Sequence, residues 1–149
     1  MMEETTPTGP EAQRLAERCA AALYERDRAS QSFGMSLSAV RPGWARVSMS
    51  VREDMTNGHG VCHGGVVFML ADSAFAFACN SYNEATVAAA AAIDFLQAAH
   101  AGDTLVAEAR ELWRTRRNGI YEIVVCNQRN ERLALFRGRS YRIDGQVAE

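Results

Sequence analysis

Asp72 is the residue whose position in the sequence most strongly indicates chemistry. It lies within an apolar stretch, residues 66–79, close to Phe68, Leu70 and Phe75. A carboxylate buried without a partner is costly, so such a group is usually paired, protonated or functional. We expect Asp72 to act as a general base or a nucleophile in a cleft, and we expect burial to raise its pKa. The alternative is a structural carboxylate on a surface stripe or one that caps a loop.

A second candidate group, His63-Gly64-Gly65, precedes the same apolar stretch. The first N–H groups of a helix have no partner within the helix and carry the positive end of its dipole. Glycine lets a ligand approach the backbone closely. Together these features predict a site for negative charge that develops on a carbonyl oxygen. Taken alone, the same three residues also fit a simple tight turn.

Helix geometry limits how these two groups can cooperate. Gly65 and Asp72 face nearly the same way on one helix, at ~100° per residue, but lie roughly 10 Å apart along its axis. A nucleophile and an oxyanion donor must both come within about 3 Å of one reacting atom. One chain cannot meet that condition, whereas two antiparallel copies of the helix can. If both groups are catalytic, the active site is shared between two subunits.

The elements that position these groups follow from apolar periodicity. We predict an amphipathic helix over 11–28, strands over 34–40 and 45–51, a loop over 57–65 and a helix over 66–82 that is apolar on all sides and therefore buried.

The second half of the chain reads as four strands. Residues 85–96 are ambiguous, because the alanine run favours a helix and its flanks favour a strand. The dipeptide Asn118-Gly119 predicts the turn of a hairpin, and Asn130-Glu131 predicts a second turn. The remaining strands are expected over 105–114, 120–126 and 133–143. This order is typical of an α+β domain, in which an antiparallel sheet wraps around one long helix and a further helix precedes it.

Size and composition indicate one globular domain. The chain has 149 residues, 48% hydrophobic and 23% charged, with a net charge of −2. We expect a disordered segment over 1–10, one domain over 11–145 and a tail over 146–149. The charge gives no bias toward nucleic acid, and the stretch 66–79 is too short to cross a bilayer. We expect neither nucleic acid nor a membrane as a partner.

The cysteines indicate a reducing compartment. They form no CxxC pair and follow no secretory signal, so we expect free thiols and a cytoplasmic protein. They are Cys19, Cys62, Cys79 and Cys126. His59, Cys62 and His63 suggest a metal site only weakly, since structural zinc takes four ligands. We expect no metal and no cofactor.

All 16 cationic side chains are arginines. A guanidinium matches a phosphate with two parallel hydrogen bonds. Two groups stand out, and each fits either a solvated basic rim or a phosphate clamp for a nucleotide-bearing carrier. They are Arg137, Arg139 and Arg142 near the last strand, and Arg114, Arg116 and Arg117 before the hairpin turn.

The central segment closely resembles the PaaI-type thioesterases of phenylacetate catabolism. The match rests on the run Asn-Gly-His-Gly-Val-Cys-His-Gly-Gly over 57–65, followed by Phe68-x-Leu-Ala-Asp72 and Ala-Phe-Ala-x-Ala-x-Asn-Ser over 74–81. It extends from about residue 34 to residue 145. Supporting stretches lie at 93–96, 101–105 and 134–140.

This resemblance implies a hotdog fold, with residues 85–96 as a strand. It implies a dimer or a dimer of dimers that hydrolyses the thioester of aromatic acyl-CoAs. Asp72 would be the catalytic carboxylate and the Gly64 N–H would bind the thioester carbonyl. His63 and Asn57 would orient substrate, carboxylate or water, although Asn57 also fits a turn cap. We further assign substrate contacts to Gly65, Ser73, Arg137 and Arg139.

One departure from the family pattern concerns the loop that follows residues 94–96. Many relatives have Arg-Pro after the Asp-Phe-Leu run, whereas Gln97-Ala98 follows here. This difference weakens any assignment of this loop as a binding site for a CoA phosphate.

Two other functions remain open. The first is a hotdog hydratase or dehydratase, in which His63 and Asp72 would move protons at carbon. The second is a non-enzymatic acyl-CoA-binding module.

Overall fold

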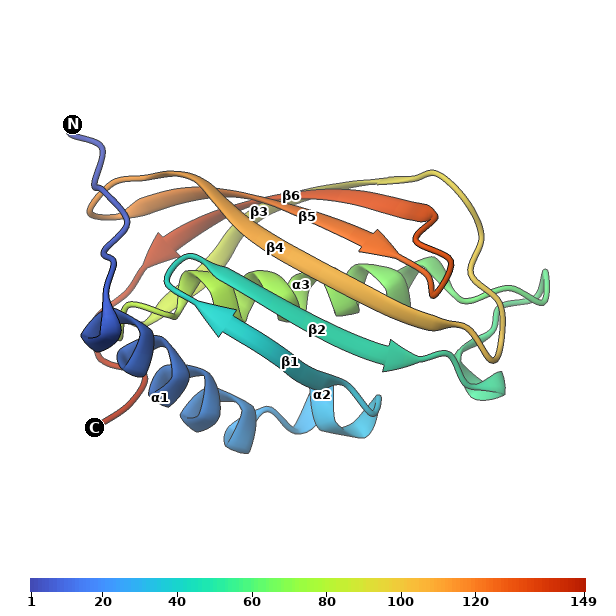
Figure 1. Ribbon diagram of the computed structural model, residues 1–149. Helices are drawn as coiled ribbons and strands as arrows, with labels where there is room; N and C mark the ends of the chain where they lie inside the picture. The colour runs from blue at the N-terminus through green and yellow to red at the C-terminus, as the bar shows by residue number, and fades with distance from the viewer.

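A six-stranded antiparallel sheet curves around one long helix, α3 (Gly64–Cys79), in the computed structural model, which describes residues 1–149 (Figure 1). The order of strands across the sheet is β1-β2-β4-β5-β6-β3. Their bounds are β1 Ser36–Arg41, β2 Trp44–Ser50, β3 Thr86–Phe95, β4 Thr104–Arg114, β5 Asn118–Cys126 and β6 Arg132–Arg142. This arrangement confirms the predicted hotdog fold.

Helix α3 forms the centre of the hydrophobic core. Phe75 packs edge-on against Tyr121 of β5, with ring centroids 5.3 Å apart, and is tilted against Phe136 of β6 at 6.1 Å. A Cβ at Gly138 of β6 would lie 2.9 Å from the Phe75 ring. Glycine at this position therefore lets the sheet approach the helix closely.

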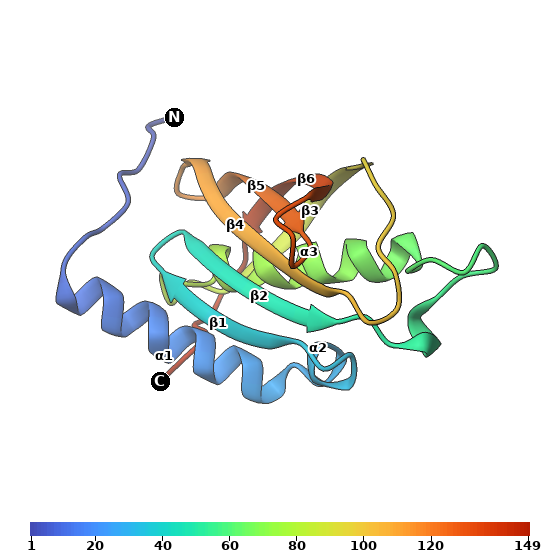
Figure 2. The ribbon, with the colours of Figure 1, turned by 45° about the vertical axis from the view of Figure 1, so that its right-hand side comes forward.

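Two helices precede the sheet, where the sequence predicted one. Helix α1 (Pro10–Arg26) lies along the β1 edge of the sheet, and a short helix α2 (Arg28–Ser32) follows (Figure 2). The break between them is at Asp27, whose side chain accepts a hydrogen bond of 2.9 Å from the N–H of Ser30 and so caps α2. No helix in the structure has both the length and the apolar character needed to cross a membrane.

The hairpin between β4 and β5 is confirmed, but its predicted turn is wrong. Residues 115–117 make the connection, and Asn118 and Gly119 are the first residues of β5. A Cβ at Gly119 would lie 2.8 Å from both the Ser140 hydroxyl and the Tyr121 ring. Close packing between strands, and not a turn conformation, therefore explains the glycine.

Strand β3 lies at one edge of the sheet and pairs only with β6. The strand predicted from family resemblance is confirmed, against the helical propensity of its alanines, because pairing with β6 outweighs local preference. Most of its side chains are exposed, including the large apolar side chains of Val87 and Phe95. An edge of this kind is a template for pairing with another strand.

The first nine residues form no helix or strand but contact β4. The Glu4 N–H donates a hydrogen bond of 2.7 Å to the Arg114 carbonyl oxygen, and the two side chains form an ion pair. The Thr6 hydroxyl donates to the Glu111 carboxylate over 3.0 Å.

Candidate active site

The N-terminus of α3 offers one free backbone donor. His63 is the N-cap, and its Nδ1 accepts a hydrogen bond of 2.8 Å from the Gly65 N–H. This contact assigns the proton of the neutral ring to Nε2, which faces away from the helix backbone. The Gly64 N–H, at the first position of the helix, has no acceptor within the helix. Of the two glycine amides predicted to bind an oxyanion, only the Gly64 amide is available.

Asn57 holds the glycine-rich loop together. Its Oδ1 accepts hydrogen bonds from the N–H groups of His59, at 2.9 Å, and Val61, at 3.3 Å. The backbone N–H of His63 donates to the Met55 carbonyl oxygen, which ties the end of the loop to its start. Asn57 is therefore a turn cap through its oxygen, and its half-buried amide group keeps two N–H donors for another partner.

Asp72 lies on the one face of α3 that the sheet leaves partly open. Gly65, Phe68, Met69, Asp72 and Ala76 are exposed or half-buried, whereas most other helix residues are buried. Spacings of three and four residues place these side chains on a single stripe. The Asp72 carboxylate on this stripe and the free Gly64 amide at the start of the helix are eight residues apart, or about 12 Å along the helix axis.

The surroundings of Asp72 favour its protonated form. Burial raises the pKa of the carboxyl group, and the negative charge of Asp27 raises it further. The predicted direction of the pKa shift is therefore confirmed. Asp27 is held in place by Ser30, whose hydroxyl donates to Asp27 over 2.6 Å and lies 2.8 Å from the Ser73 hydroxyl.

We expect Asp72→Asn to make the fold more stable at neutral pH. A raised pKa means that the folded state binds the Asp72 proton more tightly than the unfolded state, so this contribution to stability is present at low pH and lost as pH rises through the raised pKa. Asparagine cannot ionise. Thermal unfolding at about pH 7.5 should show a rise in Tm of at most about 2–4 °C, the shift that about 1 kcal/mol gives in a domain of this size. The difference should vanish below about pH 3, where Asp72 is protonated in both the folded and the unfolded state, and a lower Tm at pH 7.5 would contradict the assignment.

Ser73 points into the chain and not into a cleft. Its hydroxyl is buried and paired with that of Ser30, so it connects α3 to α2 beside Asp72. The Ser73 hydroxyl therefore has a partner inside the chain. Nothing in a single chain supports its predicted contact with substrate.

Arg137 and Arg139 are exposed on the outer face of the sheet. Their neighbours in β6, Phe136 and Gly138, face α3, and alternation along the strand turns both arginines the opposite way. Arg139 donates to the Asn118 side chain over 3.2 Å. The structure does not bring these two arginines together with Asp72 within one chain.

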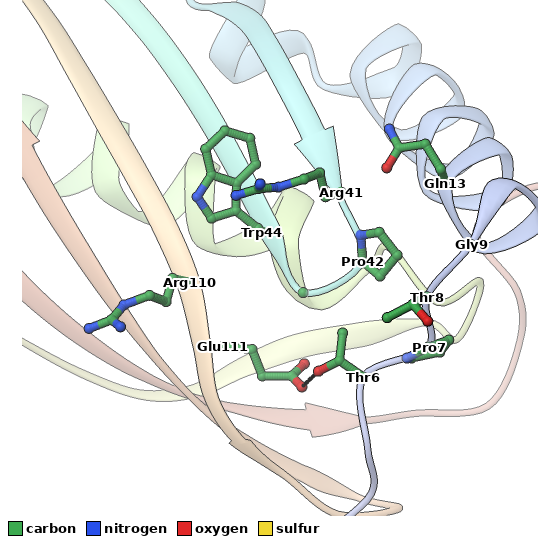
Figure 3. A pocket seen from close by; sticks show the side chains of 11 residues that line it. Thr6, Pro7, Thr8, Gly9, Gln13, Arg41, Pro42, Trp44, Arg110 and Glu111 are labelled. Atoms are coloured by element: carbon green, nitrogen blue, oxygen red, sulfur yellow. Dashed lines mark hydrogen bonds between the residues drawn. The ribbon is translucent and has the colours of Figure 1, made fainter.

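Arg114 is not free to bind a phosphate. Its side chain is almost buried, pairs with Glu4 and Glu111, and stacks on the Tyr82 ring at 4.0 Å. Tyr82 and Tyr121 both donate to the same oxygen of Glu111. This network borders a hollow of about 430 Å³ between the N-terminal segment and the β1–β2 turn, where Figure 3 shows the Thr6–Glu111 hydrogen bond. The hollow contains none of the predicted catalytic residues.

The sequence did not single out Phe95, the last residue of β3. A Cβ built on Gly64 would lie 3.1 Å from Cζ of this ring, so the ring rests on the first turn of α3. The two residues are 31 positions apart, and only the pairing of β3 with β6 brings them together. No local pattern in the sequence could indicate this contact.

Comparisons with known proteins agree with this geometry. The family model described as Thioesterase superfamily matches residues 59–134. Acyl-coenzyme A thioesterase PaaI of Escherichia coli (strain K12) is 46% identical over 85% of this chain and 90% of its own length. The structure of the E. coli PaaI protein from the phenylacetic acid degradation operon superposes with a TM-score of 0.89 over 91% of this chain and 98% of that one, at 44% identity.

A more distant relative shares the same arrangement. A variant of the phenylacetic acid degradation protein PaaI from Thermus thermophilus superposes with a TM-score of 0.74 at 34% identity, over 76% of this chain and 97% of that one. The residues that match the family model include the His63-Gly64-Gly65 start of α3, Asp72 and the strands β3, β4 and β5. The chain therefore belongs to the thioesterase superfamily and has its hotdog fold.

Proposed function

We propose that this protein hydrolyses aryl-acyl-CoA thioesters, of the phenylacetyl- or hydroxyphenylacetyl-CoA type, to the free acid and CoA. The observation that carries the proposal is the partly open face of α3. It presents the Asp72 carboxylate, whose pKa is raised, and it leads to the unoccupied N–H donor of Gly64 at the start of the helix. The relationship to the E. coli acyl-CoA thioesterase supports the choice of a CoA thioester.

In the proposed mechanism, the thioester carbonyl oxygen accepts a hydrogen bond from the Gly64 N–H. The helix dipole and this donor stabilise negative charge on the oxygen as the carbonyl carbon becomes tetrahedral. Asp72 either attacks that carbon or removes a proton from the attacking water. The thiolate of CoA then leaves, which gives the free acid directly when water attacks, or an acyl–Asp72 anhydride when Asp72 attacks, and a water molecule then hydrolyses that anhydride to the free acid and the Asp72 carboxylate. His63 Nε2–H and the Asn57 amide are the neighbouring donors that orient substrate or water.

The two halves of this site come from different subunits. Asp72 and Gly64 are about 12 Å apart on one rigid helix, which exceeds the reach of a single reacting atom. An antiparallel pair of α3 helices would bring Asp72 of one copy to the Gly64 amide of the other. The half-buried stripe on α3 and the unpaired apolar edge of β3 support such a homodimer or a dimer of dimers.

Arg137 and Arg139 are the proposed contacts for the phosphates of CoA. Both guanidinium groups are exposed and lie beside Ala92 and Ala90 of β3, whose small side chains leave space over the sheet. Ser73 enters the proposal as a support for the Asp72 helix turn, through its buried pair with Ser30.

A mixing experiment tests the shared site. Asp72→Asn chains and Gly64→Pro chains, each inactive alone, are co-refolded in equal amounts and assayed for thiol release from phenylacetyl-CoA. Random pairing gives half heterodimers, each with one complete site out of two, so activity should recover to about one quarter of wild type. Co-refolding Asp72→Asn chains with Asp72→Ala chains is the control and should restore nothing. Failure of the first mixture to recover, when heterodimers are present, would rule out a shared site.

Assaying thiol release also separates the alternatives. A panel of aromatic and aliphatic acyl-CoAs should release free CoA, with the aromatic thioesters turned over fastest. A hydratase would instead change enoyl absorbance without releasing thiol, and a binding module would bind acyl-CoA without turnover.

A further inference from the structure

The exposure of Phe95 distinguishes it from the phenylalanines of the core. Phe95 is 55% exposed, whereas Phe75, Phe77 and Phe136 are each 1% exposed. A large aromatic side chain left this open in one chain contributes little to the core of that chain. It lies on the inner face of β3, because its partner in β6, Ala134, is buried against the core.

The Phe95 ring lies beside the position that a bound thioester carbonyl would occupy. Atoms Cζ, Cε1 and Cε2 lie 3.1, 3.4 and 3.6 Å from a Cβ added to Gly64. In a helix the Cα–Cβ direction tilts toward the N-terminus, the same end from which the free N–H groups point. An oxygen bound to the Gly64 N–H would therefore lie next to this ring.

His63 forms a second side of the helix start. A Cβ added to Gly65 would lie 3.0 Å from Nδ1 of the His63 ring. The free amide of Gly64 is thus flanked by one polar ring, held by the Gly65 N–H, and one apolar ring that no hydrogen bond restrains. A ligand at this amide meets a polar side and an apolar side.

We infer that Phe95 is a wall of the acyl-binding site and determines its preference for flat aromatic acyl groups over linear ones. This inference rests on the proposed function, and it names Phe95 as the residue that determines which class of acyl group the site prefers. An aromatic acyl group can pack edge-to-face or offset against the exposed ring, a contact that a linear chain makes less well. The ring also explains why position 64 carries glycine, since any side chain there would displace it.

The test compares Phe95→Ala and Phe95→Leu with wild type, using kcat/KM for phenylacetyl-CoA and hexanoyl-CoA. The ratio of the two values should fall about three- to tenfold in Phe95→Ala, the size expected for loss of an aromatic pair. Phe95→Leu keeps an apolar side chain without a π face, so it should preserve hexanoyl-CoA hydrolysis and still lower the ratio. Trp113→Ala removes a partly exposed aromatic residue from β4 and should leave the ratio unchanged.

Two outcomes would count against the inference in different ways. An equal loss on both substrates in Phe95→Ala and Phe95→Leu would overturn the role of Phe95 and leave the thioesterase proposal intact. No thiol release from any acyl-CoA by the wild-type protein would overturn the proposed function and this inference with it.

Discussion

Asp72→Asn should lower kcat for phenylacetyl-CoA by roughly 10²–10⁴-fold, the usual contribution of a positioned general base. Asparagine keeps the size and shape of the side chain but can neither accept a proton as a carboxylate does nor attack a carbonyl at a useful rate. The loss should appear in kcat more than in KM, because the carboxylate acts on the transition state. Release of free thiol, followed over a range of substrate concentrations, measures both constants.

A loss of folded protein cannot account for the expected fall in kcat. The environment of Asp72 raises its pKa, so the neutral variant is expected to be at least as stable as wild type at neutral pH. Asp144→Asn, at an exposed carboxylate near the C-terminus, is the matched control and should keep full activity. Near wild-type kcat in Asp72→Asn would remove the carboxylate from the mechanism.

The same carboxylate should shape the pH profile. If Asp72 acts when ionised, kcat/KM rises with pH through the pKa of the free enzyme, which burial and Asp27 place above the usual aspartate value of about 3.9. Single turnover in ¹⁸O-labelled water then tests the nucleophilic route. Label that enters the Asp72 carboxylate identifies nucleophilic attack, because only hydrolysis of an acyl–Asp72 anhydride at the Asp72 carbonyl carbon places it there.

The parts of the site that the sequence predicted are those encoded locally. Asp72 stood out because a charge interrupts an apolar helix, and the helix start was marked by adjacent glycines. The separation of roughly 10 Å between Gly65 and Asp72 followed from helix geometry alone. These inferences needed no knowledge of how distant segments pack.

The parts that the sequence missed depend on contacts between distant segments. The orientation of the His63 ring decides which glycine amide is free, and this orientation is a property of the folded loop. The pairing of Ser30 with Ser73 depends on α2, a helix of five residues that begins after Asp27. The strand over 86–95 was favoured by family resemblance and not by its own alanine-rich composition, because pairing with β6 determines its structure.

Gly64→Pro should lower kcat/KM by about 10²–10³-fold, the usual effect of losing one donor to an oxyanion. Proline removes the backbone N–H at this position and suits the first residue of a helix. The preceding residue is already compatible, since His63 has φ −59° and ψ 132°, the extended region that a following proline requires. The fold should therefore tolerate the change.

The added ring atoms of proline are a second source of activity loss, because a Cβ at Gly64 lies 3.1 Å from Phe95. Gly64→Ala adds the same Cβ and keeps the N–H, so the difference between the two variants isolates the hydrogen bond. We expect the alanine variant to lose at most about tenfold, as the half-exposed Phe95 ring can turn aside. Equal losses in the two variants would mean that crowding against Phe95, and not the missing donor, slows the reaction. A much larger loss for proline, with kcat affected more than KM, would identify the Gly64 amide as a group that acts on the transition state.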